Sequence, residues 1–381
     1  MEFGWSDEDL TFRKELRAFL ASDLGDDWSG EAQKLGSEAN VEHSFGFAKT
    51  LAARGWLTPH WPEEYGGAGA SPWQHLIMAE EMWSIGEPRG PQYMNVNWIG
   101  PSIMAHGTEE QKRLHLPRIA KGDVIWCQGF SEPDAGSDLA SLRTRAVRDG
   151  DDYVVNGRKV WTSYAASAQF CYLLVRTNAE AERHRGISVL LVPTDTDGFE
   201  INSIPSVVGG HAFHELVFTD MRVPVECRLG DEDQGWAVVR EALAFERVGA
   251  PRYARAAYVL DQLVDWADAN DTELSASLTE RIGQARASCE AARLLAYRVI
   301  DERCLGLPPS PNVYLARAAM VQAERAVGAV AGELMGDEGL VYGSIADEQL
   351  RKSMVAGVAA GTYEMQLNMI AQLALKLPRE R

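Results

Sequence analysis

The hydrophobic pattern changes its period twice along these 381 residues, and this change constrains the fold more than any other feature. Up to about residue 120, apolar residues recur at helical spacing, and Ser6 with Asp9 is typical of the start of a helix. The period is then two until about residue 230, after which the helical period returns. The sequence therefore predicts an α+β protein. Its three expected parts are an N-terminal α-helical domain over 1–120, a central β domain over 121–230 and a C-terminal helical domain over 231–381.

Short runs of β-branched and aromatic residues mark the strands that we expect in the central part. Two such runs, 153–155 and 160–161, flank Asn156-Gly157, a dipeptide typical of a tight turn. We therefore predict a hairpin that turns at Asn156-Gly157. Further strands are expected at Cys171–Val175, Ile187–Val192 and Leu216–Phe218.

An apolar stripe and an Ala-rich run predict long helices in the C-terminal part. The stripe has spacings of three, four and seven residues, as on the core-facing side of a helix. The Ala-rich run, Val313–Leu334, suits close packing between helices. A four-helix bundle is the expected product. The stripe consists of Leu278, Ile282, Ala285, Cys289, Ala292 and Val299.

The composition argues against several classes of protein. A net charge of −18 disfavours a nucleic-acid partner, because a phosphate-binding surface needs clustered Lys and Arg. The chain has no basic leader before an apolar run and no stretch of 18 apolar residues, so we expect a cytoplasmic protein without a membrane anchor. Its five cysteines show no metal-ligand spacing, so no metal site is expected.

The most informative motif is WCQGFSEPDAGSDLASLRT, Trp126–Thr144, which is soon followed by Lys159–Ser163. The polar turn in this motif offers backbone N–H groups and hydroxyls to an anion. Trp161 can stack on a flat ring nearby, although a core aromatic of the β domain is the alternative. This combination suits a flavin dinucleotide.

The motif resembles the flavin-binding signature of the acyl-CoA dehydrogenase family. The resemblance extends along the chain and includes the segments Gly55–Pro72, Met104–Lys112 and Gly361–Glu380. It implies the acyl-CoA dehydrogenase-like fold, in which the central domain is a β-barrel and the C-terminal domain a four-helix bundle. It also implies FAD as cofactor, an acyl-CoA substrate and an electron acceptor such as an electron-transfer flavoprotein.

The resemblance assigns roles residue by residue. Arg247 would contact the coenzyme A arm, where a fork-shaped cation suits a pyrophosphate, or it would form an ion pair within the bundle. Ala360 would supply a backbone N–H to the thioester oxygen, and Ser137 would lie near both substrate and cofactor. The expected flavin contacts are Gln128, Phe130, Ser131, Ser137, Trp161, Ser163, Gly336 and Thr362.

The catalytic base departs from the commonest family pattern. In the family reaction a carboxylate removes the α-proton of the thioester while the β-hydride passes to flavin N5. Many members place a Glu just before Gly-Thr, but here Ala360 precedes Gly361-Thr362. A second family position, a Glu-Arg pair, is matched by Glu246-Arg247, so Glu246 is the candidate base. The alternatives are that Glu246 is a surface carboxylate and that Glu364 is the base.

Two further departures concern a neighbouring subunit. Asp337 follows Gly336 where the family has a second glycine close to the neighbour's flavin, and a carboxylate repels a phosphate. Between Tyr258 and Leu278 the chain lacks the Arg-x-x-Phe-Gly element that reaches a flavin phosphate across the subunit boundary. This pattern resembles one subunit of the bacterial α2β2 acyl-CoA dehydrogenases for bulky thioesters such as steroid side chains, and a divergent homotetramer is the alternative.

Two other functions stay open. The same fold is similar to that of flavin monooxygenases and oxidases, which need no carboxylate at Glu246. A non-catalytic subunit of a heteromeric dehydrogenase is the other alternative. The acyl group is expected to be bulky or branched, since small residues, Gly249 and Ala250, follow the base. Residues that would line its channel or pack the core are Tyr93, Met94, Asn97 and Trp98.

Overall fold

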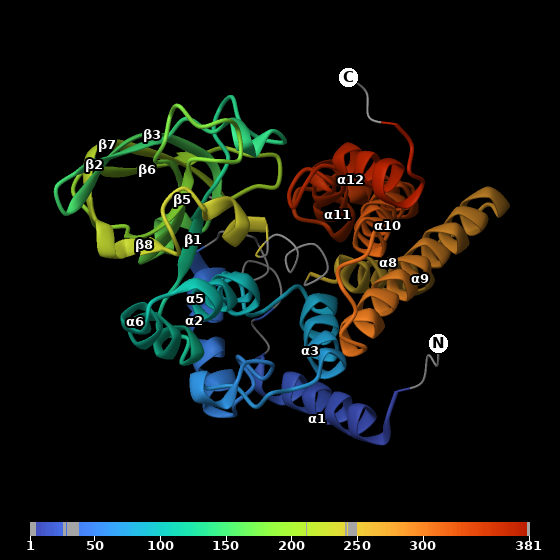
Figure 1. Cartoon of the computed structure of the whole chain (residues 1–381). Coiled ribbons are helices and arrows are strands. Elements are labelled where there is room, and N and C mark those ends of the chain that lie inside the picture. The colour runs from blue at the N-terminus through green and yellow to red at the C-terminus, as the bar shows by residue number, and fades with distance from the viewer. Residues whose placement is uncertain are drawn as a thin grey trace. The chain divides into compact units, whose positions relative to one another are not determined.

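The computed structural model describes residues 5–25, 28, 38–210, 212–240, 242 and 250–378. These residues form two compact units, each built from separate stretches of the chain (Figure 1). Unit 1 comprises Met1–Gly30, Ala70–Pro88 and Glu246–Arg381. Unit 2 comprises Glu31–Gly69 and Arg89–Phe245.

Unit 2 is built around one eight-stranded sheet, which runs in the order β6-β7-β3-β2-β4-β5-β8 with β1 paired to β4. The sheet is open, because β6 and β8 lie at its two ends and are not paired with each other in the described residues. The closed barrel expected for this domain is therefore not confirmed. The strands are β1 Trp126–Gly129, β2 Arg145–Asp149, β3 Asp152–Ser163, β4 Phe170–Arg176, β5 Ile187–Pro193, β6 Phe199–Ile204, β7 Phe213–Pro224 and β8 Arg228–Leu229.

The predicted strands at 171–175, 187–192 and 216–218 are confirmed as parts of β4, β5 and β7. The core of the sheet is made by inward-facing residues of these strands and of β3. β4 reads as a continuous apolar run because it is buried along nearly its whole length.

The predicted hairpin at Asn156-Gly157 is wrong, because these residues lie inside β3 and the chain turns earlier, between Asp149 and Asp152. Asn156 instead stands at a β-bulge opposite Asp220, whose backbone N–H donates to Asn156 Oδ1 at 2.9 Å. Gly157 is needed for close approach, since an added Cβ would lie 2.7 Å from the Cα of Thr144.

Helices complete unit 2. One helix changes its winding midway, since α4 (Gln92–Met94) continues into the π-helix η4 (Asn95–Ile99) and then into α5 (Gly100–His106). The backbone oxygen of Val96 in η4 accepts from Trp61 Nε1 at 2.8 Å and lies 3.2 Å from His60 Nε2. The other helical segments are α2 Glu38–Ala53, η3 Glu63–Tyr65, α6 Glu109–Ala120, η5 Leu139–Ser141, η6 Ala165–Ser167 and η7 Val225–Cys227, with a further helix over 235–240.

Unit 1 is helical. The helix start predicted at Ser6 is confirmed, because Ser6 and Asp9 form a capping box at the start of α1 (Asp7–Asp23). Both α1 and α3 (Pro72–Ser84) belong to the same compact unit as the C-terminal helices. The latter are α8 Arg252–Ala269, α9 Ala276–Cys304, α10 Asn312–Met335, η8 Gly336–Leu340, α11 Ile345–Val355, α12 Tyr363–Met369 and η9 Ile370–Ala374.

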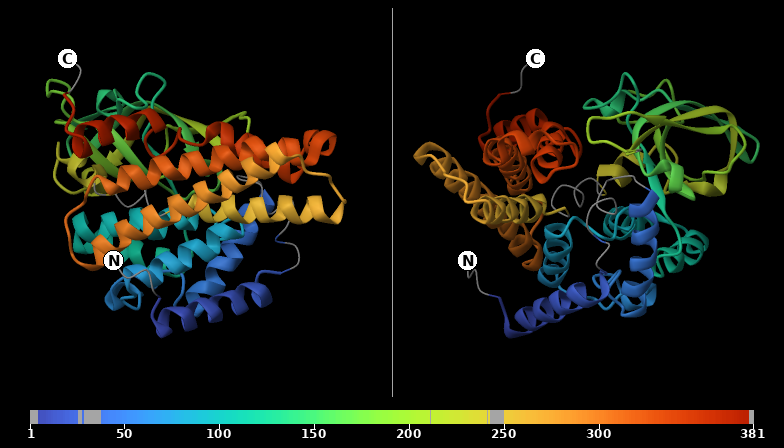
Figure 2. Two further views of the ribbon diagram at one scale, coloured as in Figure 1. Left: turned by 90° about the vertical axis from the view of Figure 1, so that its right-hand side faces the viewer. Right: turned by 180° about the vertical axis from the view of Figure 1, so that it is seen from behind.

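The predicted bundle is confirmed, since α8, α9, α10 and α11 pack around one core and its long helices run side by side (Figure 2). The predicted stripe of α9 faces that core, where Leu278, Ala285 and Cys289 are buried. The Ala-rich run corresponds to α10.

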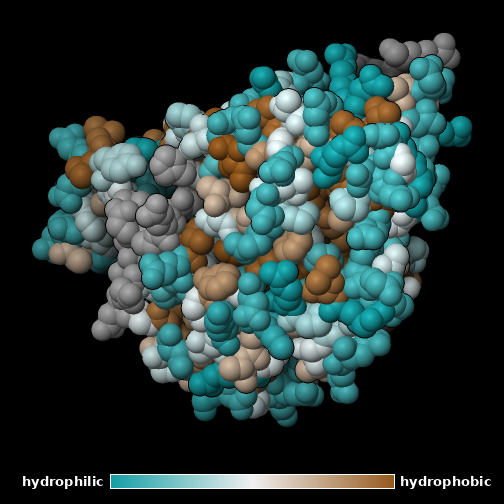
Figure 3. Space-filling model, turned by 90° about the vertical axis from the view of Figure 1, so that its left-hand side faces the viewer, coloured by the Kyte–Doolittle hydropathy of each residue, from teal (hydrophilic) through white to brown (hydrophobic). Residues whose placement is uncertain are grey.

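On one face hydrophilic side chains predominate and apolar residues lie scattered between them (Figure 3). In the part of the chain that the structure describes, no helix has the length and apolar character needed to cross a membrane.

Candidate functional site

The polar turn of the sequence motif is folded back on β3 in unit 2. It follows the end of β1 at Gly129, and Glu132 and Ala135 form a two-way backbone bridge, with N···O distances of 2.9 and 3.1 Å. The backbone N–H of Val160 donates to the oxygen of Ser131 at 2.8 Å. The strand that carries Trp161 therefore holds the turn in a fixed position beside it.

A buried ion pair anchors the same turn. Lys159 Nζ lies 2.9 Å from Glu132 Oε1 and 3.0 Å from the backbone oxygen of Phe130. The carboxylate also accepts from the backbone N–H groups of Arg143 at 2.7 Å and Thr144 at 2.8 Å. Lys159 is fully buried and Glu132 is 9% exposed. One carboxylate thus joins the turn, β3 and the segment that leads into β2.

The pKa of Glu132 reflects this environment. Burial favours the neutral acid, but the charge of Lys159 and the hydrogen bonds to the carboxylate outweigh it, so the pKa lies below its ordinary value of 4.5. Burial also lowers the pKa of Lys159, since desolvation outweighs the attraction of Glu132 there. With three donors on Glu132 and two acceptors around Lys159, the carboxylate is the better stabilised charge of the pair.

A β-bulge turns Trp161 outward. Lys159 is buried, and strict alternation along β3 would place Trp161 on the same inner face. The register against β7 shifts between Lys159 and Thr162, and as a result Thr162 is buried while Trp161 is 59% exposed. The core-aromatic alternative for Trp161 is therefore wrong.

Backbone strain accompanies this bulge. Trp161 has φ +62° and Tyr164 has φ +59°, a left-handed conformation that costs a bulky residue of order 1–3 kcal/mol. Such strain occurs most often where a side chain must be presented to a ligand.

Unengaged hydroxyls lie in the same region. The Thr162 Oγ1 atom is buried and has no hydrogen-bond partner among the residues that the structure describes. In the described residues, no hydrogen bond engages the hydroxyls of Ser131, Ser137 or Ser163 either. An exposed indole flanked by such hydroxyls fits the flat, hydrogen-bonding ring of a flavin. The remaining expected contacts, Gln128 and Phe130, are half-buried at the end of β1, where the Phe130 ring meets Tyr172 at 5.8 Å.

In unit 1, the segment between α11 and α12 is built around a left-handed alanine. Ala360 has φ +58° and is followed by Gly361 at φ +81°. Arg317 Nη2 donates to the oxygen of Ala359 at 3.0 Å, and Gln366 Nε2 donates to that of Gly361 at 3.0 Å. The backbone N–H of Ala360 has no partner in the described residues. Neighbouring carbonyls are thus held while this N–H stays available to a ligand.

Two other predicted residues lie in unit 1. Thr362 caps α12, and its Oγ1 accepts from the N–H of Met365 at 3.2 Å. Gly336 ends α10 at φ +53°, a conformation that favours glycine, and Asp337 beside it is exposed. Glu364 is exposed in the first turn of α12.

The candidate base Glu246 and its neighbour Arg247 lie outside the described residues, as does Gly249. Ala250 is described and nearly buried. Of the residues proposed for the acyl channel, Met94, Asn97 and Trp98 are buried. Both polar atoms of the Asn97 side chain lack a hydrogen-bond partner within the described part of the chain. No group of His, Cys, Asp and Glu in the described part of the chain could hold a metal ion.

Sequence reasoning missed the residues that support the site, namely Glu132, Lys159, Arg317 and Gln366. One signal was available for Glu132 and Lys159, since a lysine at an inward-facing position of a strand requires a buried partner. No comparable signal marks Arg317 or Gln366, because their partners are backbone oxygens.

Comparison with known proteins gives a consistent result along the whole chain. Residues 6–123, 127–221 and 233–375 match the N-terminal, middle and C-terminal domains of acyl-CoA dehydrogenases. The chain is 36% identical to the acyl-CoA dehydrogenase FadE26 of Mycobacterium tuberculosis, over 100% of this chain and 99% of that protein.

Two solved structures are similar throughout. The Tcur3481-Tcur3483 steroid ACAD has a TM-score of 0.91 and 32% identity, covering 100% of both chains. The ChsE4-ChsE5 complex from Mycobacterium tuberculosis has a TM-score of 0.88 and 33% identity, again over 100% of both chains.

Proposed function

Since this chain belongs to the acyl-CoA dehydrogenase family, and is thus an oxidoreductase with FAD as its cofactor, we propose that it dehydrogenates a bulky acyl-CoA with Glu246 as the base. The observation that carries the proposal is that residue 360 is an alanine. This residue stands where many relatives carry the base, yet its methyl group cannot accept a proton. The carboxylate must therefore come from another position, and Glu246 matches the second position of the family.

Each group of the chain has one task in the proposed reaction. Glu246 removes the α-proton, and the backbone N–H of Ala360 donates to the thioester oxygen as negative charge develops there. Arg247 binds the coenzyme A arm. Trp161 and the hydroxyls of Ser131 and Ser163 hold the cofactor ring, with the buried Glu132–Lys159 pair fixing the turn behind them. FAD held by these residues would supply the acceptor for the β-hydride, at N5.

The further proposed contacts complete this assignment. Gln128 and Phe130 would line the flavin edge, Ser137 would lie near the phosphates and the substrate, and Thr362 and Gly336 would contact flavin phosphates. The division into domains 1–120, 121–230 and 231–381 likewise remains our proposal.

The substrate class is proposed from the relatives. A steroid ACAD is among the most similar structures, and the chain resembles it over its full length. Small residues at 249 and 250 beside the base leave space for a ring-bearing or branched acyl group. A steroid side chain attached to coenzyme A is therefore the substrate that we favour.

We propose that the chain assembles with a homologous subunit as an α2β2 tetramer and passes its electrons to an electron-transfer flavoprotein. Similarity to the ChsE4-ChsE5 complex supports assembly with a second, different chain. Leu340, Val341 and Tyr342 support it too, because they are 79%, 61% and 64% exposed in unit 1, and neighbouring large apolar residues exposed to this degree are typical of an interface.

The first test is the flavin-to-protein ratio of the chain purified alone, measured from visible absorbance together with its mass in solution. We expect little flavin, because Asp337 and the missing Arg-x-x-Phe-Gly element weaken the site that two subunits share. One flavin per chain in a homotetramer would overturn the proposed partnership.

The second test separates catalysis from binding. Glu246→Gln removes the proposed base with little change in shape, so we expect turnover of a bulky acyl-CoA to fall by at least about 10³-fold with flavin content unchanged. Glu364→Gln is the matched control, because it changes an exposed carboxylate near Ala360, and it should keep activity. Equal activity of the two variants would refute the role of Glu246.

A further inference from the structure

The start of α8 is held by buried polar contacts in unit 1. The helix begins at Arg252, six residues after the proposed base Glu246 in the chain. Both residues belong to unit 1, as does Ala360. The contacts that hold the start of α8 therefore also limit where the segment that carries the base can lie.

One of these contacts is a hydrogen bond to a carboxylate that four helices share. Tyr253 in the first turn of α8 donates from its hydroxyl to Glu80 Oε1 on α3, at 2.7 Å. Arg13 on α1 and Tyr297 on α9 donate to Oε2 of the same carboxylate, at 2.7 and 3.3 Å. Glu80 is 6% exposed and Tyr253 is 2% exposed. The carboxylate thus ties α8 to three other helices inside the unit.

Both tyrosines act as donors to this carboxylate. Burial, together with the negative charge of Glu80 close by, raises the pKa of Tyr253 well above its ordinary value of 10. The same two causes raise the pKa of Tyr297 to about 12. Both hydroxyls are therefore protonated near neutral pH, and each gives its hydrogen to Glu80.

A second set of buried contacts holds the same turn of α8 from α10 and α11. Arg255 Nη2 donates to Glu324 Oε1 on α10 and to Gln349 Oε1 on α11, both at 3.3 Å. Glu324 is 2% exposed, and its Oε2 lies 3.9 Å from Arg252 Nη1. Gln349 in turn donates to the backbone oxygen of Glu324 at 3.0 Å. The start of α8 is thus fixed at two separate points.

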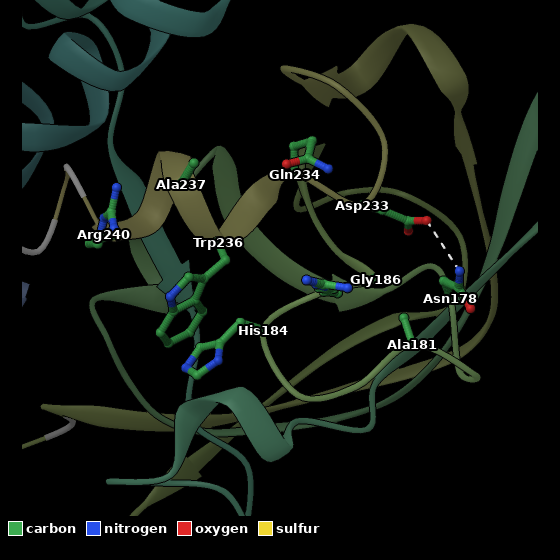
Figure 4. A pocket seen from close by; sticks show the side chains of 10 residues that line it. Asn178, Ala181, His184, Gly186, Asp233, Gln234, Trp236, Ala237 and Arg240 are labelled. Atoms are coloured by element: carbon green, nitrogen blue, oxygen red, sulfur yellow. Dashed lines mark hydrogen bonds between the residues drawn. The ribbon is translucent and has the colours of Figure 1, made fainter.

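A carboxylate beside a surface pocket is less constrained. In the pocket of about 450 Å³ in unit 2, Asp233 accepts from the exposed Asn178 Nδ2 at 3.4 Å (Figure 4). Water can take the place of such a donor at little cost. Glu80 is closed off from solvent, so the loss of one donor leaves an unsatisfied acceptor or requires a helix to move.

We propose that Tyr253 is a positioning residue, whose hydrogen bond to Glu80 fixes the start of α8 and thereby the approach of Glu246 to the substrate. The inference rests on Glu246 as the base. Tyr253 touches neither substrate nor cofactor in this proposal and acts through α8 alone. Proton removal depends steeply on geometry, since a misplacement of about 1 Å can lower a rate by about 100-fold.

The test compares two variants that each remove one donor from the same carboxylate. Tyr253→Phe deletes the hydroxyl on α8, and Tyr297→Phe deletes the hydroxyl on α9. In the flavin-loaded enzyme, we expect Tyr253→Phe to lower kcat by about 10-fold, with KM and flavin content unchanged. The isotope effect on kcat for a substrate deuterated at the α-carbon should also rise, because proton removal becomes slower relative to the other steps. Tyr297→Phe should keep the kcat and the isotope effect of the native enzyme.

A second pair of variants probes the other point of attachment. Arg255→Lys loosens the contact with α10 and α11 and should lower kcat in the same way, whereas Asp261→Asn removes an exposed ion pair further along α8 and should not. Turnover is assayed well below the melting midpoints of all variants. A native kcat in Tyr253→Phe, or an equal fall in Tyr253→Phe and Tyr297→Phe, would overturn the inference. Retained turnover in Glu246→Gln would instead refute the proposed reaction.

Discussion

Glu132→Gln tests how the flavin turn is held in place. The change keeps the size of the side chain but removes its charge. Lys159, which is fully buried, then has only the backbone oxygen of Phe130 and one amide oxygen as acceptors. The amide nitrogen must also face the backbone N–H of Arg143 or Thr144, since both now donate to the carboxylate.

The expected cost follows from that geometry. Removing one partner of a buried ion pair costs about 3–5 kcal/mol, because the remaining charge stays desolvated and unpaired. For a chain of 381 residues, this loss should lower the midpoint of thermal unfolding by about 4–6 °C. Because the turn is part of the proposed flavin site, FAD added to the protein should be released at a lower temperature as well.

Asp138→Asn is the matched control for this experiment. Asp138 belongs to the same turn, but it and its partner Arg183 are both exposed, so its loss should cost under about 1 kcal/mol. Melting is followed by circular dichroism and flavin release by fluorescence. If Glu132→Gln melts within about 2 °C of Asp138→Asn, the reasoning from burial is refuted.

The pH dependence of the same pair has a defined sign. The folded-state pKa of Glu132 lies below its ordinary value of 4.5, so its stabilisation is fully present above about that pH. It is lost as the pH falls through the folded-state value. Glu132→Gln should therefore flatten the acid limb of the stability profile of the protein.

Three further predictions follow from single contacts. Trp161→Leu should weaken flavin binding by about 2- to 10-fold, measured by flavin titration, whereas Trp161→Phe should not. Arg317→Gln releases the carbonyl of Ala359, so kcat should fall by about 10-fold with KM and flavin content nearly unchanged in steady-state assays. Burial lowers the pKa of His60 from 6.5 to about 4, so the native protein should lose roughly 3 kcal/mol as the pH falls between these values. His60→Asn should lose less in thermal melts across that range.

Long periodic segments could be predicted from the sequence because their pattern reports burial directly. The stripe of α9 and the apolar run of β4 both point to a core, and the structure places them there. The prediction of a hairpin at Asn156-Gly157 was wrong because this dipeptide occurs both in tight turns and where two backbone segments approach closely. Gly157 serves a close approach to Thr144 rather than a turn, and this need comes from a strand that is distant in sequence.

The bulge at Trp161 shows why local pattern is insufficient at the site itself. Alternation from Lys159 predicts an inward Trp161, whereas one register shift against β7 exposes the ring and buries Thr162. The sequence motif named the right residue, but its orientation depends on a partner strand some fifty residues away along the chain.

The backbone around Ala360, in the proposed catalytic site, also depends on contacts with residues elsewhere in the chain. A left-handed alanine is disfavoured by about 1 kcal/mol, so other contacts must hold it. Arg317 and Gln366 hold it by donating hydrogen bonds to backbone oxygens. These bonds leave the N–H of Ala360 unengaged, and they do not involve the side chain at position 360. A chain in which this position supplies only a backbone donor can take its base from a different part of the sequence. The loss of a carboxylate at 360 is therefore compatible with a functional thioester site, provided that Glu246 takes over proton removal.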